Sequence, residues 1–183
     1  MLEDLVVQYC APTLAGIKTG SLFSCPFTSY DTLKANIRQL NRALVPKGVC
    51  VLPLRLWQDR ALIYLFRPER LKQDLSCAEA ACLLRSAGYP CTKPERCIIR
   101  LMQRLQEQAD FPHEIGLFLG YPPEDVRGFI ENKAKNFKCV GCWKVYGDEN
   151  AAKKRFAQYD TYTDLYCRSL HNGKTIAQLA VPV

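Results

Sequence analysis

The sequence has 183 residues, of which 48% are hydrophobic and 23% are charged, and its formal net charge is +7. This apolar content excludes a disordered chain, no apolar run approaches the roughly 18–20 residues of a membrane span, and the acidic start MLEDLVVQYC is unlike a secretory signal. The bases are mostly interleaved with acids and form no nucleic-acid-binding motif, so we expect a cytoplasmic protein and do not expect nucleic acid as its partner.

The first 48 residues predict a short helix, a strand and a longer helix. The short helix has the apolar stripe Leu2, Leu5, Val6 and Tyr9. It is expected to end at residues 10–12, because the proline at position 12 lacks the N–H that a helix needs. A strand-like pair, Leu22-Phe23, follows. The longer helix begins after Thr28 or Ser29, and the sequence Pro-Lys-Gly at 46–48 stops it. Its apolar face consists of Leu33, Ile37, Leu40 and Leu44.

Two strands are predicted at residues 49–56 and 61–66, joined around residues 58–60. Pro53 has no N–H to donate to a sheet ladder, so the first strand is expected to lie at a sheet edge or to contain a bulge. Pro68 is a good first-turn residue and marks the start of a further helix.

The next segment is mainly helical. Two capping boxes, Ser76 to Glu79 and Thr92 to Glu95, each open a helix, and the first helix ends at Gly88. The second helix has the apolar side Ile98, Met102, Leu105 and Ala109. A short helix is expected within residues 111–119. A further helix begins at Pro122 and is expected to bury Val126, Phe129 and Ile130.

The C-terminal part predicts one strand at 137–146, a helix capped by Asp148, and a turn at Asn172-Gly173. Ala152, Phe156 and Tyr159 form the inner face of that helix. Strands and helices do not alternate as βαβ units, so the sequence favours an α+β fold with a small, mainly antiparallel sheet covered by several helices. No repeat or linker divides the chain, and we expect a single domain of residues 1–183.

The ten cysteines are interpreted mainly as reduced core residues, because most lie within apolar patterns. Cys139 and Cys142 form a CxxC. We expect them inside the last strand, where residues three apart point to opposite faces, so we assign no metal ligands. Metal or redox handling by these thiols stays an alternative.

Cys10 and His113 are the candidates for catalysis. Cys10 is expected near a helix end, in an accessible loop, where the nearby Lys18 would lower the pKa of its thiol. If the imidazole of His113 lay beside this thiol, the pair would support acyl transfer. His113 also has a simple alternative role in packing at a helix start. The residues after it lack the second histidine of a metalloprotease helix.

Amines and aromatic rings gather in the segment 131–146. A surface of this kind grips an anion such as a phosphate or a carboxylate, with a ring stacked against the ligand, although a solvated helix end is the alternative. The expected ligand-binding residues are Lys18, Glu114, Tyr121, Lys133, Trp143, Lys144 and Tyr146.

Three phrases, CAPTLAGIK at residues 10–18, HEIGLFLGYPPEDV at 113–126 and WKVYGD at 143–148, resemble an uncharacterised, mainly clostridial bacterial family known as domain of unknown function 3793. The resemblance implies a cytoplasmic protein of anaerobic bacteria and suggests that the three phrases converge on one site. It implies no reaction. The chain departs from the family pattern at Ala134, where glycine is usual, and at Cys142, where tyrosine is usual.

Three functions follow from these residues. The leading hypothesis is a binding domain with a basic and aromatic pocket for an anionic small molecule or an acidic partner segment. The second is a thiol enzyme using Cys10 and His113, and the third is metal or redox handling. The sequence identifies no cofactor and does not decide whether any reaction is catalysed.

Overall fold

The computed structural model describes residues 2–90, 93–107 and 111–182, and it confirms the predicted α+β class. The chain divides into two compact units. We call residues 1–69 and 161–183 the sheet unit, and residues 70–160 the helical unit. No described helix has the combination of length and apolarity that crossing a bilayer requires.

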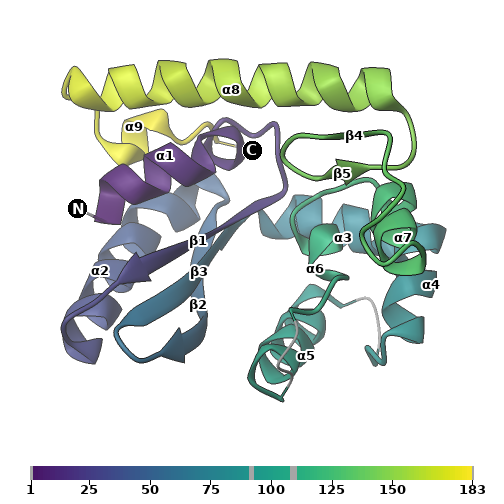
Figure 1. The fold of residues 1–183 in the computed structure, drawn as a ribbon. Coiled ribbons are helices and arrows are strands. Elements are labelled where there is room, and N and C mark those ends of the chain that lie inside the picture. Colours follow the sequence, from purple (N-terminus) through teal and green to yellow (C-terminus); the bar gives the residue numbers. More distant parts are fainter. Residues whose placement is uncertain (1, 91–92, 108–110, 183) are drawn as a thin grey trace. The chain divides into compact units, whose positions relative to one another are not determined.

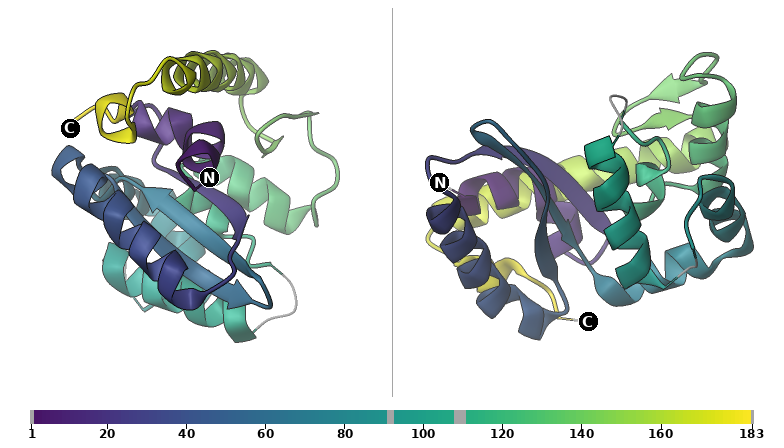
Figure 2. Two further views of the ribbon diagram at one scale, coloured as in Figure 1. Left: turned by 90° about the vertical axis from the view of Figure 1, so that its left-hand side faces the viewer. Right: turned by 90° about the horizontal axis from the view of Figure 1, so that it is seen from below.

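The sheet unit contains one antiparallel sheet with the strand order β1-β3-β2 (Figure 1). Its strands are β1 (Gly20–Pro26), β2 (Cys50–Trp57) and β3 (Arg60–Phe66). Its helical elements are α1 (Leu2–Leu14), α2 (Tyr30–Leu44), the 3-10 turn η1 (Val45–Lys47), the end of α8 (Glu149–His171) and α9 (Ile176–Leu179). The core combines α1, α2 and α9 with the sheet face that carries Ala61, Ile63 and Leu65. Figure 2 shows α2 lying along this sheet.

The longer N-terminal helix and the edge strand are as predicted. In α2, the four apolar residues expected to form one face are all buried. The strand β2 lies at an edge of the sheet, and its pairing with β3 shifts register between Pro53 and Arg55. This irregularity falls where the missing N–H of a proline interrupts the ladder.

The predicted end of the first helix is wrong. Helix α1 continues through Pro12 to Leu14, so Cys10 lies inside a helix and not in a loop. Tyr9 is 50% exposed, whereas Val7 is fully buried, so the apolar face also differs from the predicted stripe. Burial of the residues around Pro12 outweighs the lost hydrogen bond, since propensity yields to tertiary packing.

The helical unit contains five helices, a two-stranded hairpin and the first part of α8 within its described residues. These elements are α3 (Pro68–Ser76), which begins just before the unit, α4 (Ala78–Ser86), α5 (Pro94–Glu107), α6 (Ile115–Phe118), α7 (Pro123–Glu131), β4 (Cys139–Val140) and β5 (Lys144–Val145). Asp148 caps α8 as predicted, because its Oδ1 accepts the N–H of Ala151 at 2.9 Å.

The prediction of one continuous strand at residues 137–146 is wrong, because this segment forms a hairpin of two short strands, β4 and β5. The chain reverses at Gly141, whose N–H donates to the carbonyl of Trp143 at 3.1 Å. A Cβ atom at Gly141 would lie 2.3 Å from the Phe156 ring on α8. The hairpin therefore depends on a glycine at its closest approach to the helix, and alternating hydrophobicity does not reveal such a reversal.

Smaller corrections concern the central helices. Helix α4 was expected to be capped by Ser76, but its cap is Cys77, whose sulfur accepts the N–H of Ala80. The hydroxyl of Ser76 instead donates to the carbonyl of Gln73. Ile130, expected in the core, is 38% exposed. In α5 the buried residues are Cys97, Ile98, Leu101 and Leu105. The predicted cap Thr92 and the predicted face residue Ala109 lie outside the described residues.

Candidate functional site

The predicted site residues fall in both units of the chain. Cys10 and Lys18 belong to the sheet unit, and His113 and the other predicted residues belong to the helical unit. Cys10 is fully buried among core residues. Burial raises the pKa of its thiol to about 12, and this outweighs the opposing effects of the Lys18 charge and of a hydrogen bond from Ser21. These properties do not favour Cys10 as a nucleophile, because the thiolate is the reactive form.

We expect Cys10 to be among the slowest cysteines to react with iodoacetamide in the native protein at pH 8. With its pKa raised to about 12, it carries about three orders of magnitude less thiolate than an ordinary cysteine of pKa near 8.5. Peptide mapping of the alkylated protein measures the rate at each thiol, with the exposed Cys82 as the internal reference. Rapid alkylation of Cys10 before that of Cys82 would revive the thiol-enzyme hypothesis.

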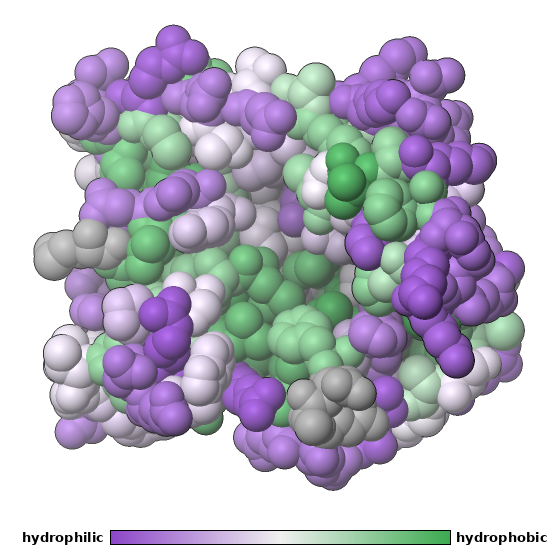
Figure 3. Space-filling view, viewed as in Figure 1, coloured by the Kyte–Doolittle hydropathy of each residue, from purple (hydrophilic) through white to green (hydrophobic). Residues whose placement is uncertain are grey.

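Four predicted residues of the helical unit line one pocket of about 330 Å³, which we call the aromatic pocket. They are His113, Tyr121, Trp143 and Lys144. Most of the remaining wall is apolar and comes from Phe111, Ile115, Val126, Phe129 and Val140. The space-filling view shows apolar side chains gathered around the β4–β5 hairpin at the upper right (Figure 3), and Val140 on this hairpin is 62% exposed.

The amine of Lys144 is held in place at the pocket wall. Its Nζ donates to the carbonyl of Ala134 at 2.8 Å and lies 4.7 Å from the ring centroid of Phe137 and 5.9 Å from that of Phe129. Aromatic faces attract cations at these distances. The positive charge is therefore fixed by three partners and does not depend on a freely rotating side chain.

Trp143 is fixed by a buried aspartate that the sequence analysis did not assign to the site. Its Nε1 donates to Asp125 Oδ2 at 2.7 Å, and Asp125 Oδ1 accepts the N–H groups of Tyr146 and Gly147, each at 2.7 Å. Asp125 is only 3% exposed. One carboxylate thus joins the first turn of α7 to both ends of strand β5 and sets the position of the Trp143 ring.

A family model described as protein of unknown function (DUF3793) matches residues 6–180. The chain belongs to this family. No curated protein and no solved structure matches this chain. The match confirms the resemblance noted in the three phrases, and it includes every residue of the aromatic pocket.

Two of the three DUF3793 phrases meet in the aromatic pocket, since His113 and Tyr121 come from one and Trp143 and Lys144 from the other. Lys133 and Tyr146 do not line it. The ring of Tyr146 packs on Gly128, where a Cβ atom would lie 2.4 Å from it. Its phenol oxygen is buried without a hydrogen-bond partner among the described residues.

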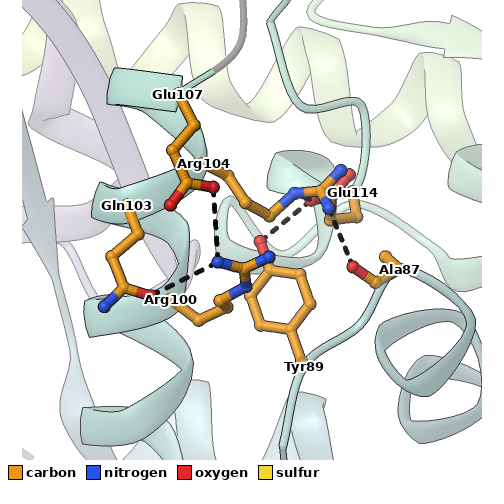
Figure 4. A network of polar contacts seen from close by, with 7 residues as sticks. All are labelled: Ala87, Tyr89, Arg100, Gln103, Arg104, Glu107 and Glu114. Atoms are coloured by element: carbon orange, nitrogen blue, oxygen red, sulfur yellow. Dashed lines mark hydrogen bonds and ion pairs between the residues drawn. The ribbon is translucent and has the colours of Figure 1, made fainter.

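Glu114 belongs to a buried network and does not line the pocket (Figure 4). Its Oε1 forms an ion pair with Arg104 Nε at 2.6 Å and accepts the hydroxyl of Tyr89 at 2.9 Å, and Arg104 Nη1 donates to the carbonyl of Ala87 at 2.8 Å. Burial and the adjacent carboxylate raise the pKa of Tyr89. Glu114 therefore links α6 to α5 and to the end of α4, which is a structural contribution.

The CxxC of this DUF3793 member lies at the hairpin reversal. Cys139 is half-buried and Cys142 is exposed. Within residues 2–90, 93–107 and 111–182, no group of three or more His, Cys, Asp or Glu side chains is arranged to hold a metal ion. The structure thus supplies these two thiols with no further ligand in that part of the chain.

The backbone at position 134 adopts a conformation that favours glycine, the residue that the resemblance implies there. Ala134 has φ +62°, in the left-handed region, and its neighbour Lys133 has φ +50°. We expect Ala134→Gly to raise the free energy of unfolding by about 0.5–1 kcal/mol, because glycine has no Cβ penalty there. Urea denaturation measures this change.

Ala157→Gly is the matched control for this substitution. Ala157 is an exposed residue within the helix α8, so glycine should lower stability by about 1 kcal/mol there. A destabilised Ala134→Gly variant would show that the left-handed conformation costs less than the added flexibility of the unfolded chain.

Proposed function

We propose that the helical unit is a ligand-binding module and that its aromatic pocket holds an anionic small molecule. The observation that carries this proposal is the fixed ammonium of Lys144, 2.8 Å from the Ala134 carbonyl and against two rings. An ammonium has three N–H donors, and this bond uses one of them. In the proposed complex, the remaining donors bind the ligand anion at the pocket wall.

The surrounding side chains support binding in preference to a covalent reaction. Trp143 and Tyr121 are stacked, with ring centroids 4.8 Å apart, and the ring of His113 meets Phe129 edge-on at 5.0 Å. Apolar and aromatic walls with few polar groups are typical of small-molecule sites, whose volumes are about 300–1,000 Å³. The buried Cys10 and the half-buried Lys18, both in the sheet unit, are not part of this proposal.

The proposal is tested with 8-anilinonaphthalene-1-sulfonate, an aromatic anion whose fluorescence rises on binding. We expect Lys144→Met to weaken binding of this probe at least tenfold, or about 1.4 kcal/mol. Lys138→Met is the matched control, because Lys138 also donates to a carbonyl, that of Gly147 at 2.7 Å, but does not line the pocket. Equal losses in the two variants would contradict the proposal.

Protection of Cys142 locates the bound probe. Cys142 lines the aromatic pocket and is exposed, so an occupied pocket should slow its alkylation, whereas the exposed Cys82 lies outside the pocket and should react at an unchanged rate. If the probe binds without protecting Cys142, it occupies another surface and the proposed site is wrong.

A further inference from the structure

Contacts within the helical unit hold the walls of the aromatic pocket in place. Trp143 donates to Asp125 and also meets the ring of Phe156 edge-on, with ring centroids 4.6 Å apart. The hydroxyl of Tyr121 donates to the carbonyl of Cys142 at 3.1 Å. Rings held in this way lose little conformational freedom when a ligand enters, so they favour a rigid partner.

The ring content of the wall indicates a planar ligand. Phe111, His113, Tyr121, Phe129 and Trp143 all contribute to a pocket of about 330 Å³. Aromatic pairs gain about 0.5–1.5 kcal/mol beyond simple burial when they stack or meet edge-on. A saturated ring of equal size would bury a similar area but would not gain this additional stabilisation from aromatic contacts. The volume lies near the lower limit for small-molecule sites, which suits one or two fused rings.

If the ligand is an anion, as proposed, the charges of the wall favour a monovalent anion over a dianion. Lys144 is the lysine of the described pocket lining, and the buried carboxylate of Asp125 lies in the same wall. A phosphate monoester carries a charge of about −1.5 to −2 and three acceptor oxygens at neutral pH, which one ammonium does not balance. A carboxylate carries a single charge that one ammonium can pair, and its desolvation cost is correspondingly smaller.

We infer that the ligand of the aromatic pocket is a planar aromatic monocarboxylate, with its ring among the pocket rings and its carboxylate on Lys144. This inference rests on the proposed function and narrows its ligand class. The probe is 2-naphthoate, compared with its neutral analogue 2-naphthalenemethanol, the dianion 2-naphthyl phosphate and the saturated decahydro-2-naphthoate. Each is measured by calorimetry and by displacement of 8-anilinonaphthalene-1-sulfonate.

We expect 2-naphthoate to bind at least tenfold more tightly than each of the three analogues and to protect Cys142 from alkylation. Lys144→Met should remove its advantage over the neutral alcohol, and Lys138→Met should preserve it. Because Lys144→Met also removes the bond to Ala134, the affinity of the neutral alcohol serves as the measure of an intact pocket in each variant.

The outcomes separate this inference from the proposed function. If the anilinonaphthalene sulfonate binds with protection of Cys142 but 2-naphthoate does not displace it, the carboxylate assignment is overturned and the binding function stands. If 2-naphthyl phosphate binds more tightly than 2-naphthoate, the inference that the ligand is monovalent is overturned. If decahydro-2-naphthoate binds as tightly as 2-naphthoate, the inference that the ligand is planar is overturned. If neither the sulfonate nor 2-naphthoate protects Cys142, both proposals fall together.

Discussion

Replacing Asp125 by alanine is expected to lower the free energy of unfolding by about 3–5 kcal/mol, because hydrogen bonds to a charged group contribute about 1.5–3 kcal/mol each and are not fully additive. The substitution leaves three donors without their acceptor: the indole of Trp143 and the N–H groups of Tyr146 and Gly147. Urea denaturation monitored by circular dichroism measures the change. The aromatic pocket should lose its affinity for 8-anilinonaphthalene-1-sulfonate, since the Trp143 ring is then no longer fixed.

Asp125→Asn separates the two roles of this carboxylate. An asparagine retains one acceptor for the two backbone N–H groups but places an NH₂ group against the indole N–H, so we expect an intermediate loss of about 2 kcal/mol. Glu124→Ala is the control on the same turn of α7, where the side chain is exposed and its removal should cost less than about 1 kcal/mol. Similar losses at positions 124 and 125 would mean that the carboxylate of Asp125 does not hold the hairpin.

Local patterns predicted most elements of the fold. The apolar repeat of α2, the edge strand at Pro53 and the cap at Asp148 all follow from side-chain spacing or from the chemistry of a single residue. The sequence failed where distant contacts decide the outcome. Helix α1 passes through Pro12 because its neighbours are buried, and position 141, where β4 and β5 reverse, has no room for a side chain because Phe156 lies against it.

The sequence predicted only part of the candidate site, again because contacts between distant residues decide the rest. Residues close in sequence to Trp143 and His113 were identified from their amines and rings, and four of the predicted residues line one pocket. Sequence spacing does not reveal the role of Asp125, because its partners lie 18 to 22 positions further along the chain. Glu114 was assigned to the ligand, although its partner Arg104 lies on another helix. Sequence spacing indicates which groups are available, whereas tertiary contacts determine which of them are already paired.

Arg67 should be the most sensitive position of the sheet unit. Its side chain is 1% exposed, and it donates to the carbonyls of Thr13 and Leu14 at 2.7 Å and of Val181 at 2.8 Å. It thereby satisfies acceptors at the end of α1 that a helix leaves without partners. We expect Arg67→Met to lower the free energy of unfolding by about 3–5 kcal/mol, because buried carbonyls lose a charged donor. Chemical denaturation gives this value.

Arg67→Lys and Arg60→Met complete the test. A lysine keeps the charge but lacks the planar fork that reaches several carbonyls at once, so we expect about half the loss. Arg60 is the first residue of β3, the strand that ends just before Arg67, and it bonds to Ser24, but this contact is exposed, so its replacement should cost less than about 1 kcal/mol. Amide exchange at Val181, whose N–H donates to Leu14, should accelerate in Arg67→Met and stay unchanged in Arg60→Met. If exchange at Val181 does not respond to Arg67→Met, the guanidinium does not hold the C-terminal segment against α1, and the stability of the sheet unit rests on its apolar core alone.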